Sequence, residues 1–180
     1  MGSFDHLFKV LVVGDSSVGK SSLLNRYVND VFGKEYKMTM GGQERFTSMT
    51  RLYYKQASAC VIMFDLTNSD SFRSCQMWKN DLDSKVTLPN GDLVPCILLA
   101  NKCDLSPWAV SKEEIDQFSK ENNFIGWTET SVKENKNINE SMRVLIERMM
   151  ETREYGRSSI PPQGDYINLK DISVPGSGCC

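Results

Sequence analysis

Short apolar runs alternate along this 180-residue chain with longer segments in which apolar residues recur every three or four positions. Most of the short runs are nearly continuously apolar, which is typical of strands buried on both faces of a parallel sheet. The periodic segments predict amphipathic helices. The expected strands are 7–13, 59–66, 94–100 and 127–130, and the expected helices are 21–27, 69–83, 111–121 and about 137–153. This alternation predicts an α/β fold, with a mostly parallel sheet and helices on both faces.

The end of the chain differs from the rest. The last expected helix carries an apolar stripe that we interpret as core and not as a cofactor site, formed by Ile138, Met142, Leu145, Ile146 and Met149. From about Thr152 the pattern gives way to Gly, Ser and Pro, so we expect one domain over residues 1–151 and a flexible tail over 152–180. Asn90-Gly91 resembles a hairpin turn, but we favour a plain loop there.

Composition excludes several classes of function. The net charge is only -2 and no basic run occurs, so nothing favours nucleic-acid binding. We find no long apolar stretch and no signal-peptide core, and we expect a cytosolic protein. The single histidine, His6, excludes a His-dependent triad and an HExxH zinc site. Four of the six cysteines lie in apolar or helical segments without CxxC spacing and are expected to be reduced core thiols, namely Cys60, Cys75, Cys96 and Cys103.

The segment from Gly14 to Ser21 matches the P-loop pattern GxxxxGK[ST], between an expected strand and an expected helix. Its glycines let backbone N–H groups and the helix N-terminus face a polyphosphate, while Lys20 reaches the outer phosphates and the Ser21 hydroxyl ligates Mg²⁺. A glycine turn that binds nothing is disfavoured by these flanks. The candidate phosphate-binding residues are Gly14, Asp15, Ser16, Ser17, Val18, Gly19, Lys20, Ser21 and Ser22.

A second polar motif, Asn101-Lys102-Cys103-Asp104, follows the strand expected at 94–100. It therefore lies at the carboxyl end of a parallel strand, where open α/β sheets bind ligands. A carboxylate there can accept hydrogen bonds from N1–H and the N2 amine of guanine, whereas adenine offers no such donors. The tetrapeptide alone could equally be a polar cap on the strand. With a P-loop upstream, it predicts guanine over adenine and disfavours an ATP-using P-loop kinase.

With these motifs, the chain resembles the Rab family of Ras-like small GTPases. The resemblance also rests on Gly42-Gln43-Glu44-Arg45-Phe46, Leu52-Tyr53-Tyr54-Lys55, Phe64-Asp65-Leu66-Thr67, Glu129-Thr130-Ser131-Val132-Lys133 and Cys179-Cys180. Trp108, Trp127 and the tail segment 164–169 resemble the branch of Golgi, lysosomal and lysosome-related membranes. The resemblance implies a P-loop NTPase fold, binding of GTP or GDP with Mg²⁺, hydrolysis of GTP to GDP and phosphate, and a switch role in vesicle trafficking.

The resemblance also implies roles for individual residues. Phe32 would pack on the guanine, and Thr39 would ligate Mg²⁺ and sense the γ-phosphate. Gln43 would be the catalytic glutamine that orients the attacking water. The loop beside the base would be formed by Ser131, Val132 and Lys133, in which valine replaces the family's usual alanine.

Membrane attachment is implied by the Cys179-Cys180 pair, which resembles the double-geranylgeranylation signal of Rabs; two unmodified thiols are the alternative. The tail charges balance, so two lipids would supply the anchoring. The expected partners are Rab escort protein with prenyltransferase, GDI, exchange and activating factors, and effectors. The expected location is the cytosolic face of Golgi, lysosomal or vesicle membranes, with a cytosolic pool.

One interval departs from the family. Only 21 residues separate Lys20 from Gly42, whereas the resemblance implies about 45, so about 25 residues of switch I and switch II are missing near residues 39–42. We therefore expect the strand pair after switch I to be absent and the strand at 7–13 to become an exposed edge prone to aggregation. Nucleotide affinity should fall and GTP hydrolysis should be weak or lost. The alternative function is a truncated isoform that binds nucleotide poorly and does not switch.

Overall fold

The structure is a computed structural model that describes residues 9–32 and 55–153 of the chain. Strands and helices alternate throughout this part, as the apolar pattern predicts. The elements are β1 (Val10–Val13), α1 (Lys20–Phe32), β2 (Ala59–Asp65), α3 (Ser69–Lys85), β3 (Cys96–Asn101), α4 (Lys112–Glu121), β4 (Gly126–Glu129) and α5 (Ile138–Arg153). None of the described helices combines the length and the apolar character needed to cross a lipid bilayer.

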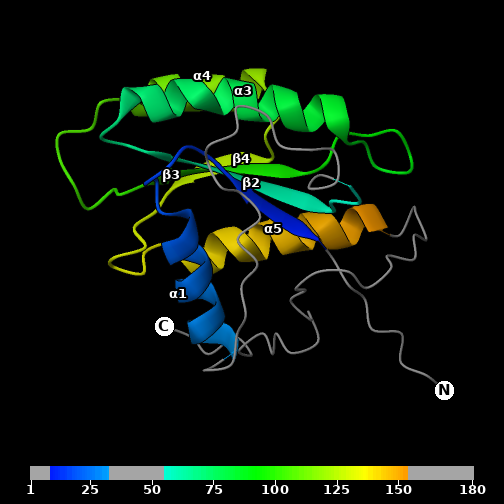
Figure 1. Cartoon of the computed structure of the whole chain (residues 1–180), viewed down its shortest axis with the longest axis horizontal. Helices are drawn as coiled ribbons and strands as arrows, with labels where there is room; N and C mark the ends of the chain where they lie inside the picture. Colours follow the sequence, from blue (N-terminus) through cyan, green and yellow to red (C-terminus); the bar gives the residue numbers. More distant parts are fainter. Residues whose placement is uncertain (1–8, 33–54, 154–180) are drawn as a thin grey trace.

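The four described strands form one parallel sheet in the order β1-β2-β3-β4. The register pairs Val13 with Ile62 and Asp65 with Asn101. Helices α3 and α4 cover one face of the sheet, and α1 and α5 lie on the other (Figure 1). Because all strands run in the same direction, their carboxyl ends meet at one edge, where the loops of a binding site can converge.

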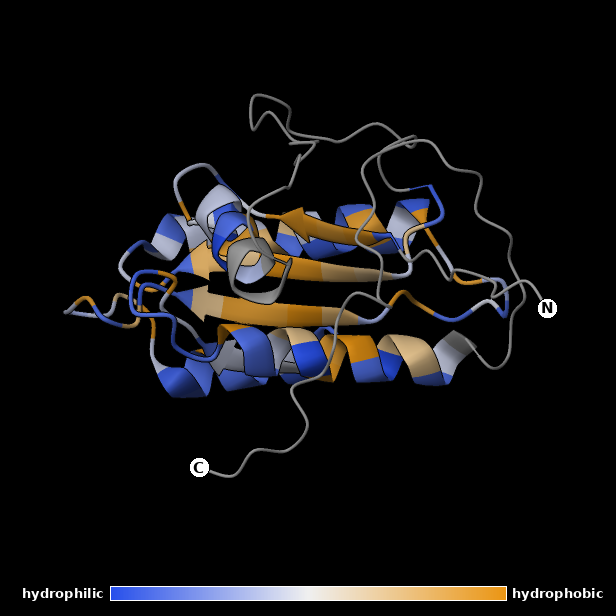
Figure 2. Cartoon of the chain, turned by 90° about the horizontal axis from the view of Figure 1, so that it is seen from below, coloured by the Kyte–Doolittle hydropathy of each residue, from blue (hydrophilic) through white to orange (hydrophobic). Residues whose placement is uncertain are grey.

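Each face of the sheet belongs to its own core cluster. Along β2, alternate residues point to opposite faces, so Phe64 packs in the cluster under α3 and α4, and Met63 packs in the cluster under α1 and α5. Every residue of β2 is buried. Figure 2 shows the strands mostly in hydrophobic colours, whereas the helices carry both hydrophobic and hydrophilic colours. The α/β class is therefore confirmed, and so is the burial of β2 and β3 on both faces, whereas β4 is only half-buried.

Local hydrogen bonds define where two helices begin. The side chain of Asn68 accepts from the backbone N–H groups of Asp70 and Ser71 at the start of α3. Ser111 and Glu114 form a reciprocal capping box at the start of α4. Such caps satisfy backbone donors that have no partner inside a helix. The predicted helices 69–83 and 111–121 are confirmed to within two residues.

Two sequence expectations need correction. The segment at Asn90-Gly91 is a tight turn and not a plain loop, because Thr87 and Leu93 form an isolated antiparallel bridge and the Leu88 N–H donates to the Asp92 carbonyl. The turn suits glycine, since Gly91 has φ of +88°. The second correction concerns the cysteines, of which only three of the four expected core thiols are buried.

The four cysteines of the described residues are free thiols. Cys60, Cys75 and Cys96 are buried as expected, but Cys103 is only half-buried because it lies in the loop after β3 and not in the core. The apolar stripe of α5 is core, with Ile138, Leu145 and Met149 buried.

The expected edge strand falls partly outside the described residues. Among the described strands, β1 lies at one end of the sheet and pairs with β2. The segment in which the sequence predicts a missing strand pair, residues 33–54, is not described. The absence of that strand pair therefore stays a prediction, and so do the domain boundary at 151 and the flexible tail at 152–180.

Candidate functional site

The P-loop connects β1 to α1 and passes close to two neighbouring strands. Gly14 has φ of +153° and Gly19 has φ of +108°. A Cβ atom would lie 2.3 Å from the Met63 carbonyl oxygen at Gly14, and 2.4 Å from Nδ2 of Asn101 at Gly19. Both positions therefore require glycine for backbone conformation and for space. These contacts hold the loop against the carboxyl ends of β2 and β3.

The first residue of α1 closes the P-loop. The Lys20 ammonium donates to the carbonyl oxygens of Gly14, at 2.6 Å, and of Asp15, at 2.7 Å. Ser21 and Ser22 follow in the first turn of α1, whose N-terminal N–H groups and helix dipole favour an anion. Ser16 and Ser17 are exposed on the loop, and Val18 is buried beneath it. The geometry suits a phosphate group.

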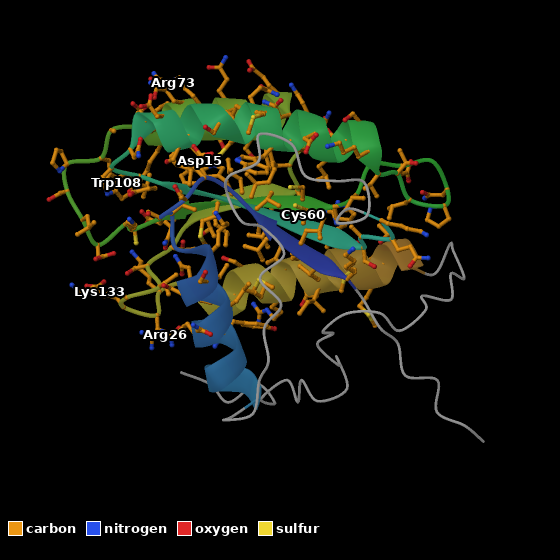
Figure 3. All side chains as sticks on the ribbon, in the orientation of Figure 1. Asp15, Arg26, Cys60, Arg73, Trp108 and Lys133 are labelled. Carbon is orange, nitrogen blue, oxygen red and sulfur yellow. The ribbon has the colours of Figure 1, made fainter. Side chains whose placement is uncertain are left out.

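Helix α3 forms a side wall of the P-loop. The indole N–H of Trp78 donates to Oδ1 of Asp15 at 3.2 Å. Trp78 is buried in the core, so its ring position is fixed by packing. Figure 3 shows Asp15 at the loop between β1 and α1, below α3. The sequence predicts Asp15 as a site residue but gives no sign of this partner.

Asn101 joins three segments of the chain. Its Nδ2 donates to the Val18 carbonyl of the P-loop at 2.8 Å. Its Oδ1 accepts from the Thr130 hydroxyl at 3.1 Å and from the Val132 backbone N–H at 3.3 Å. The side chain is buried, so water competes little for these hydrogen bonds. Asn101 therefore fixes the P-loop relative to the loop after β4.

Lys102 extends from the same motif towards the end of β2. Its ammonium lies 2.9 Å from Oδ2 of Asp65. Oδ1 of Asp65 accepts from the backbone N–H and the hydroxyl of Thr67, at 2.8 and 2.7 Å. Burial raises the pKa of Asp65, but the bonds from Thr67 and Lys102 outweigh burial and hold that pKa below its usual value. Asp65 therefore carries a charge that can position Lys102.

Asp104 is held by the loop that follows β4. The Ser131 hydroxyl donates to Oδ1 of Asp104 at 2.8 Å, and the same hydroxyl oxygen accepts from the Glu134 backbone N–H at 3.1 Å. Ser131 is fully buried, whereas Asp104 is half-exposed. Ser131 and Lys136 also form a short antiparallel bridge that closes the loop. The carboxylate of Asp104 is thus fixed at the surface of the site.

These segments enclose a cleft of about 740 Å³. That volume lies in the range of small-molecule sites. The predicted residues that line it are Gly19, Ser22, Asn101, Lys102, Asp104, Val132 and Lys133. The structure therefore brings the phosphate motif and the base motif to one cleft. The side chain of Phe32, and residues Thr39, Gln43, Cys179 and Cys180, lie outside what the structure describes.

Sequence reasoning missed several residues of the site. Asn25, Arg26 and Leu105 also line the cleft. Leu105 directly follows Asp104, and Arg26 lies one helical turn after Ser22, so both could have been found by extending the motifs. Trp78 carries no such signal, because its partner is 63 residues away in the sequence.

The cleft has the donors and acceptors that a guanine nucleotide requires. The N-terminus of α1 favours phosphate, and the Asp104 carboxylate could accept from N–H groups such as those that guanine presents. Of the two predicted Mg²⁺ ligands, Ser21 lies in the described part of the chain, in the first turn of α1. The described residues contain no cluster of three His, Cys, Asp or Glu side chains that could hold a metal ion. A hydroxyl with phosphate oxygens is a suitable ligand set for that ion.

Fold and cleft together define a P-loop nucleotide-binding protein built on a parallel α/β sheet. The comparisons with known proteins narrow this class. The Ras family model matches residues 41–151, and the model "Ras of Complex, Roc, domain of DAPkinase" matches residues 9–42. The chain is 62% identical to Ras-related protein Rab-7L1 of Homo sapiens over the whole of both chains.

Two further relatives are more distant. Identity is 41% to Ras-related protein Rab-32 of Mus musculus, over 98% of this chain and 91% of the relative. It is also 41% to Ras-related protein Rab-32B of Dictyostelium discoideum, over 97% of this chain and 78% of the relative. The chain belongs to the Rab family of Ras-like small GTPases.

The length of one alignment is informative. The alignment with human Rab-7L1 runs over 204 positions, although this chain has 180 residues, so at least 24 positions carry no residue of this chain. The two family models meet at residues 41–42.

Proposed function

We propose that this chain binds GTP and GDP as a Rab-type switch of intracellular membrane trafficking. The observation that carries the proposal is the contact of Asn101 with both the P-loop and the loop after β4, because it joins a phosphate-binding end and a base-binding end in one cleft. In the intact family the activity is hydrolysis of GTP to GDP and phosphate. Membership of the Rab family supports the trafficking role.

Each end of the cleft recognises a different part of the nucleotide. The P-loop and Lys20 bind the phosphates, and Asp104, held by Ser131, accepts hydrogen bonds from the guanine edge. Ser21 and Thr39 would hold Mg²⁺, which neutralises phosphate charge when bound. Phe32 would cover the base, and Gln43 would orient the attacking water. Positioning supplies most of the rate in such phosphoryl transfer.

We further propose that residues 1–151 form the GTPase domain and that residues 152–180, of which the first two still belong to α5, form a flexible tail. Prenyl groups on Cys179 and Cys180 would anchor the tail to the cytosolic face of Golgi, lysosomal or vesicle membranes. Escort protein with prenyltransferase, GDI, exchange and activating factors, and effectors would then be the partners. Mass spectrometry of the terminal peptide from eukaryotic cells should find two prenyl groups, and an unmodified peptide would contradict this part.

A second candidate is a truncated form that binds nucleotide poorly and neither switches nor hydrolyses GTP. The 24 alignment positions without a residue of this chain favour it, and so does the meeting of two family models at residues 41–42. Loss of residues between Thr39 and Gly42 would bring switch I and switch II together, so that they could not sense the γ-phosphate separately.

Nucleotide content of the purified protein separates the two candidates. The protein is denatured, and the released nucleotide is identified and quantified by chromatography. Guanine nucleotide near one per chain supports the switch, and an empty protein supports the truncated form. The matched variant Asp104→Ala should lose guanine nucleotide if the cleft is the site. Adenine nucleotide in the wild-type protein would contradict both candidates.

A further inference from the structure

Arg26 links α1 to the loop that follows β4. Its Nε donates to the Val132 carbonyl oxygen at 3.1 Å, and its Nη2 donates to the Lys133 carbonyl oxygen at 3.0 Å. Figure 3 shows Arg26 on α1 next to Lys133 on that loop. The planar guanidinium offers several N–H groups in a fixed fork, so it can hold two successive carbonyl groups where a lysine ammonium could not hold both equally well.

The two bonds also orient the peptide groups on the other side of the loop. In a planar trans peptide, the N–H points opposite to the C=O of the same peptide. With the Lys133 carbonyl directed at Arg26, the Glu134 N–H is directed away from α1. There it donates to Oγ of Ser131 at 3.1 Å. One end of the peptide therefore contacts Arg26, and the other contacts the hydroxyl beside the base site.

The hydroxyl of Ser131 connects the Glu134 peptide to Asp104. A hydroxyl has one proton, and here the oxygen accepts from Glu134 while the proton is donated to Oδ1 of Asp104 at 2.8 Å. Ser131 is fully buried, so its hydroxyl is shielded from water although Asp104 is half-exposed. The chain of contacts from Arg26 thus ends on the carboxylate of Asp104.

We propose that Arg26 is a positioning residue for base recognition, which sets the carboxylate of Asp104 through Lys133, Glu134 and Ser131. This inference rests on the proposed guanine-nucleotide function. Because α1 begins at Lys20, the helix that supports the phosphate site also determines the geometry of the base site. Selectivity for the guanine amine then depends on a side chain that lines the cleft but whose hydrogen bonds go to the loop after β4.

The test compares GDP with inosine diphosphate, whose base lacks the exocyclic amine. In Arg26→Gln, the ratio of the two affinities should fall about tenfold, the equivalent of one hydrogen bond. Arg26→Lys should give a smaller fall. Arg143→Gln is the matched control, because Arg143 lies on α5 in an exposed pair with Glu147 and should leave the ratio unchanged. Equal losses for both nucleotides in Arg26→Gln would overturn the proposal.

A double-variant cycle tests the route. If Arg26 acts through Ser131, then Arg26→Gln should change the GDP to inosine diphosphate ratio in wild-type protein but add nothing in Ser131→Ala. Independent, additive changes would place Arg26 outside this chain of contacts and overturn the proposal.

Hydrogen exchange of the nucleotide-free protein decides the question even if the protein binds neither nucleotide. The Glu134 amide should exchange about tenfold faster in Arg26→Gln than in wild type, while amides of β2 stay unchanged. Unchanged exchange at Glu134 would overturn the role of Arg26. A wild-type protein that binds neither nucleotide would contradict the proposed function alone.

Discussion

Gly19 lies where the P-loop contacts Asn101. Its substitution tests both the backbone conformation and the space that this position requires. In Gly19→Ala, the new Cβ would lie 2.4 Å from Nδ2 of Asn101 at φ of +108°. Strain and the displaced hydrogen bonds of Asn101 should lower the free energy of unfolding by roughly 3 kcal/mol. Urea denaturation measures the change. The same variant should also lose bound nucleotide.

The control for this prediction is Gly91→Ala. Gly91 has φ of +88°, but nothing lies within 4 Å of its Cβ position. Only backbone strain should appear, and the expected cost is about 1 kcal/mol. If both variants lost the same free energy, the contact between Gly19 and Asn101 would be unimportant for stability.

The described cysteines should differ in reactivity. Burial raises the pKa of the Cys75 thiol, with a further contribution from Asp15, and burial beside Cys60 raises the pKa of Cys96. Burial raises the pKa of Cys103 as well, so access of the reagent makes the difference, and brief alkylation of the folded protein should spare the three buried thiols and label half-buried Cys103. Mass spectrometry of peptides gives the extent at each site, and rapid labelling of Cys96 would contradict the packing.

Single residues show why motifs predict a site only in part. Asn101 and Asp104 could be found because their spacing after a strand is itself the signal. The contacts of Arg26 and Trp78 could not, since their partners Val132 and Asp15 are 106 and 63 residues away in the sequence. Such contacts depend on which strands become neighbours, and local pattern does not contain that information.

At the scale of elements, the ends of β2 and β3 are tied by Asp65 and Lys102, and this tie should depend on pH. The folded state lowers the pKa of Asp65, because bonds from Thr67 and Lys102 outweigh burial. The stabilisation is fully present above the unfolded pKa and is lost as pH falls through the lower, folded pKa. Asp65→Asn should therefore cost roughly 1–2 kcal/mol at pH 7 and approach zero cost in acid.

Urea denaturation over a range of pH tests this expectation. Asp92→Asn is the control, because Asp92 lies in the exposed turn after α3 and its carboxylate contacts Asn90. Its curve should follow that of the wild type. A loss in Asp65→Asn that stays constant down to acidic pH would mean that the charge of Asp65 does not contribute.

Elements were predictable where burial imposes a period. β2 and β3 are apolar except for their last residues, Asp65 and Asn101, and are predicted to within two residues, because a strand buried on both faces tolerates few polar side chains. The turn at 87–93 does not follow from the sequence pattern, since one bridge between Thr87 and Leu93 has no period to detect. Helix α1 continues to Phe32, beyond the predicted end at Tyr27, because Asn29 and Asp30 are weak helix formers and obscure the pattern.

At the scale of the whole molecule, the alternation of strands and helices determined the fold class. With one parallel sheet, every strand ends at the same edge, so two motifs 80 residues apart had to meet there. Under the proposed function, hydrolysis makes a further demand, because Thr39 and Gln43 would have to reach this edge independently. Only four residues of the chain run from Thr39 to Gly42, and four residues span at most about 14 Å.

A chimera tests whether that short connection limits the protein. Residues 33–41 are replaced by the segment of human Rab-7L1 that lies between the positions aligned with Phe32 and Gly42. Because misplacement of catalytic groups by about 1 Å can cost a hundredfold in rate, the original chain should hydrolyse GTP about a hundredfold more slowly than the chimera. Phosphate release at saturating GTP measures both rates.

Two variants of the chimera give the experiment its controls. Gln43→Leu should abolish the recovered hydrolysis while GDP binding remains, which assigns the gain to water positioning and not to refolding of the sheet. Asp104→Ala should weaken GDP binding in the chimera, since the base site is common to both proteins. Equal hydrolysis by the original chain and the chimera would show that the short connection already places Gln43 correctly, and the truncated form would then be an active switch.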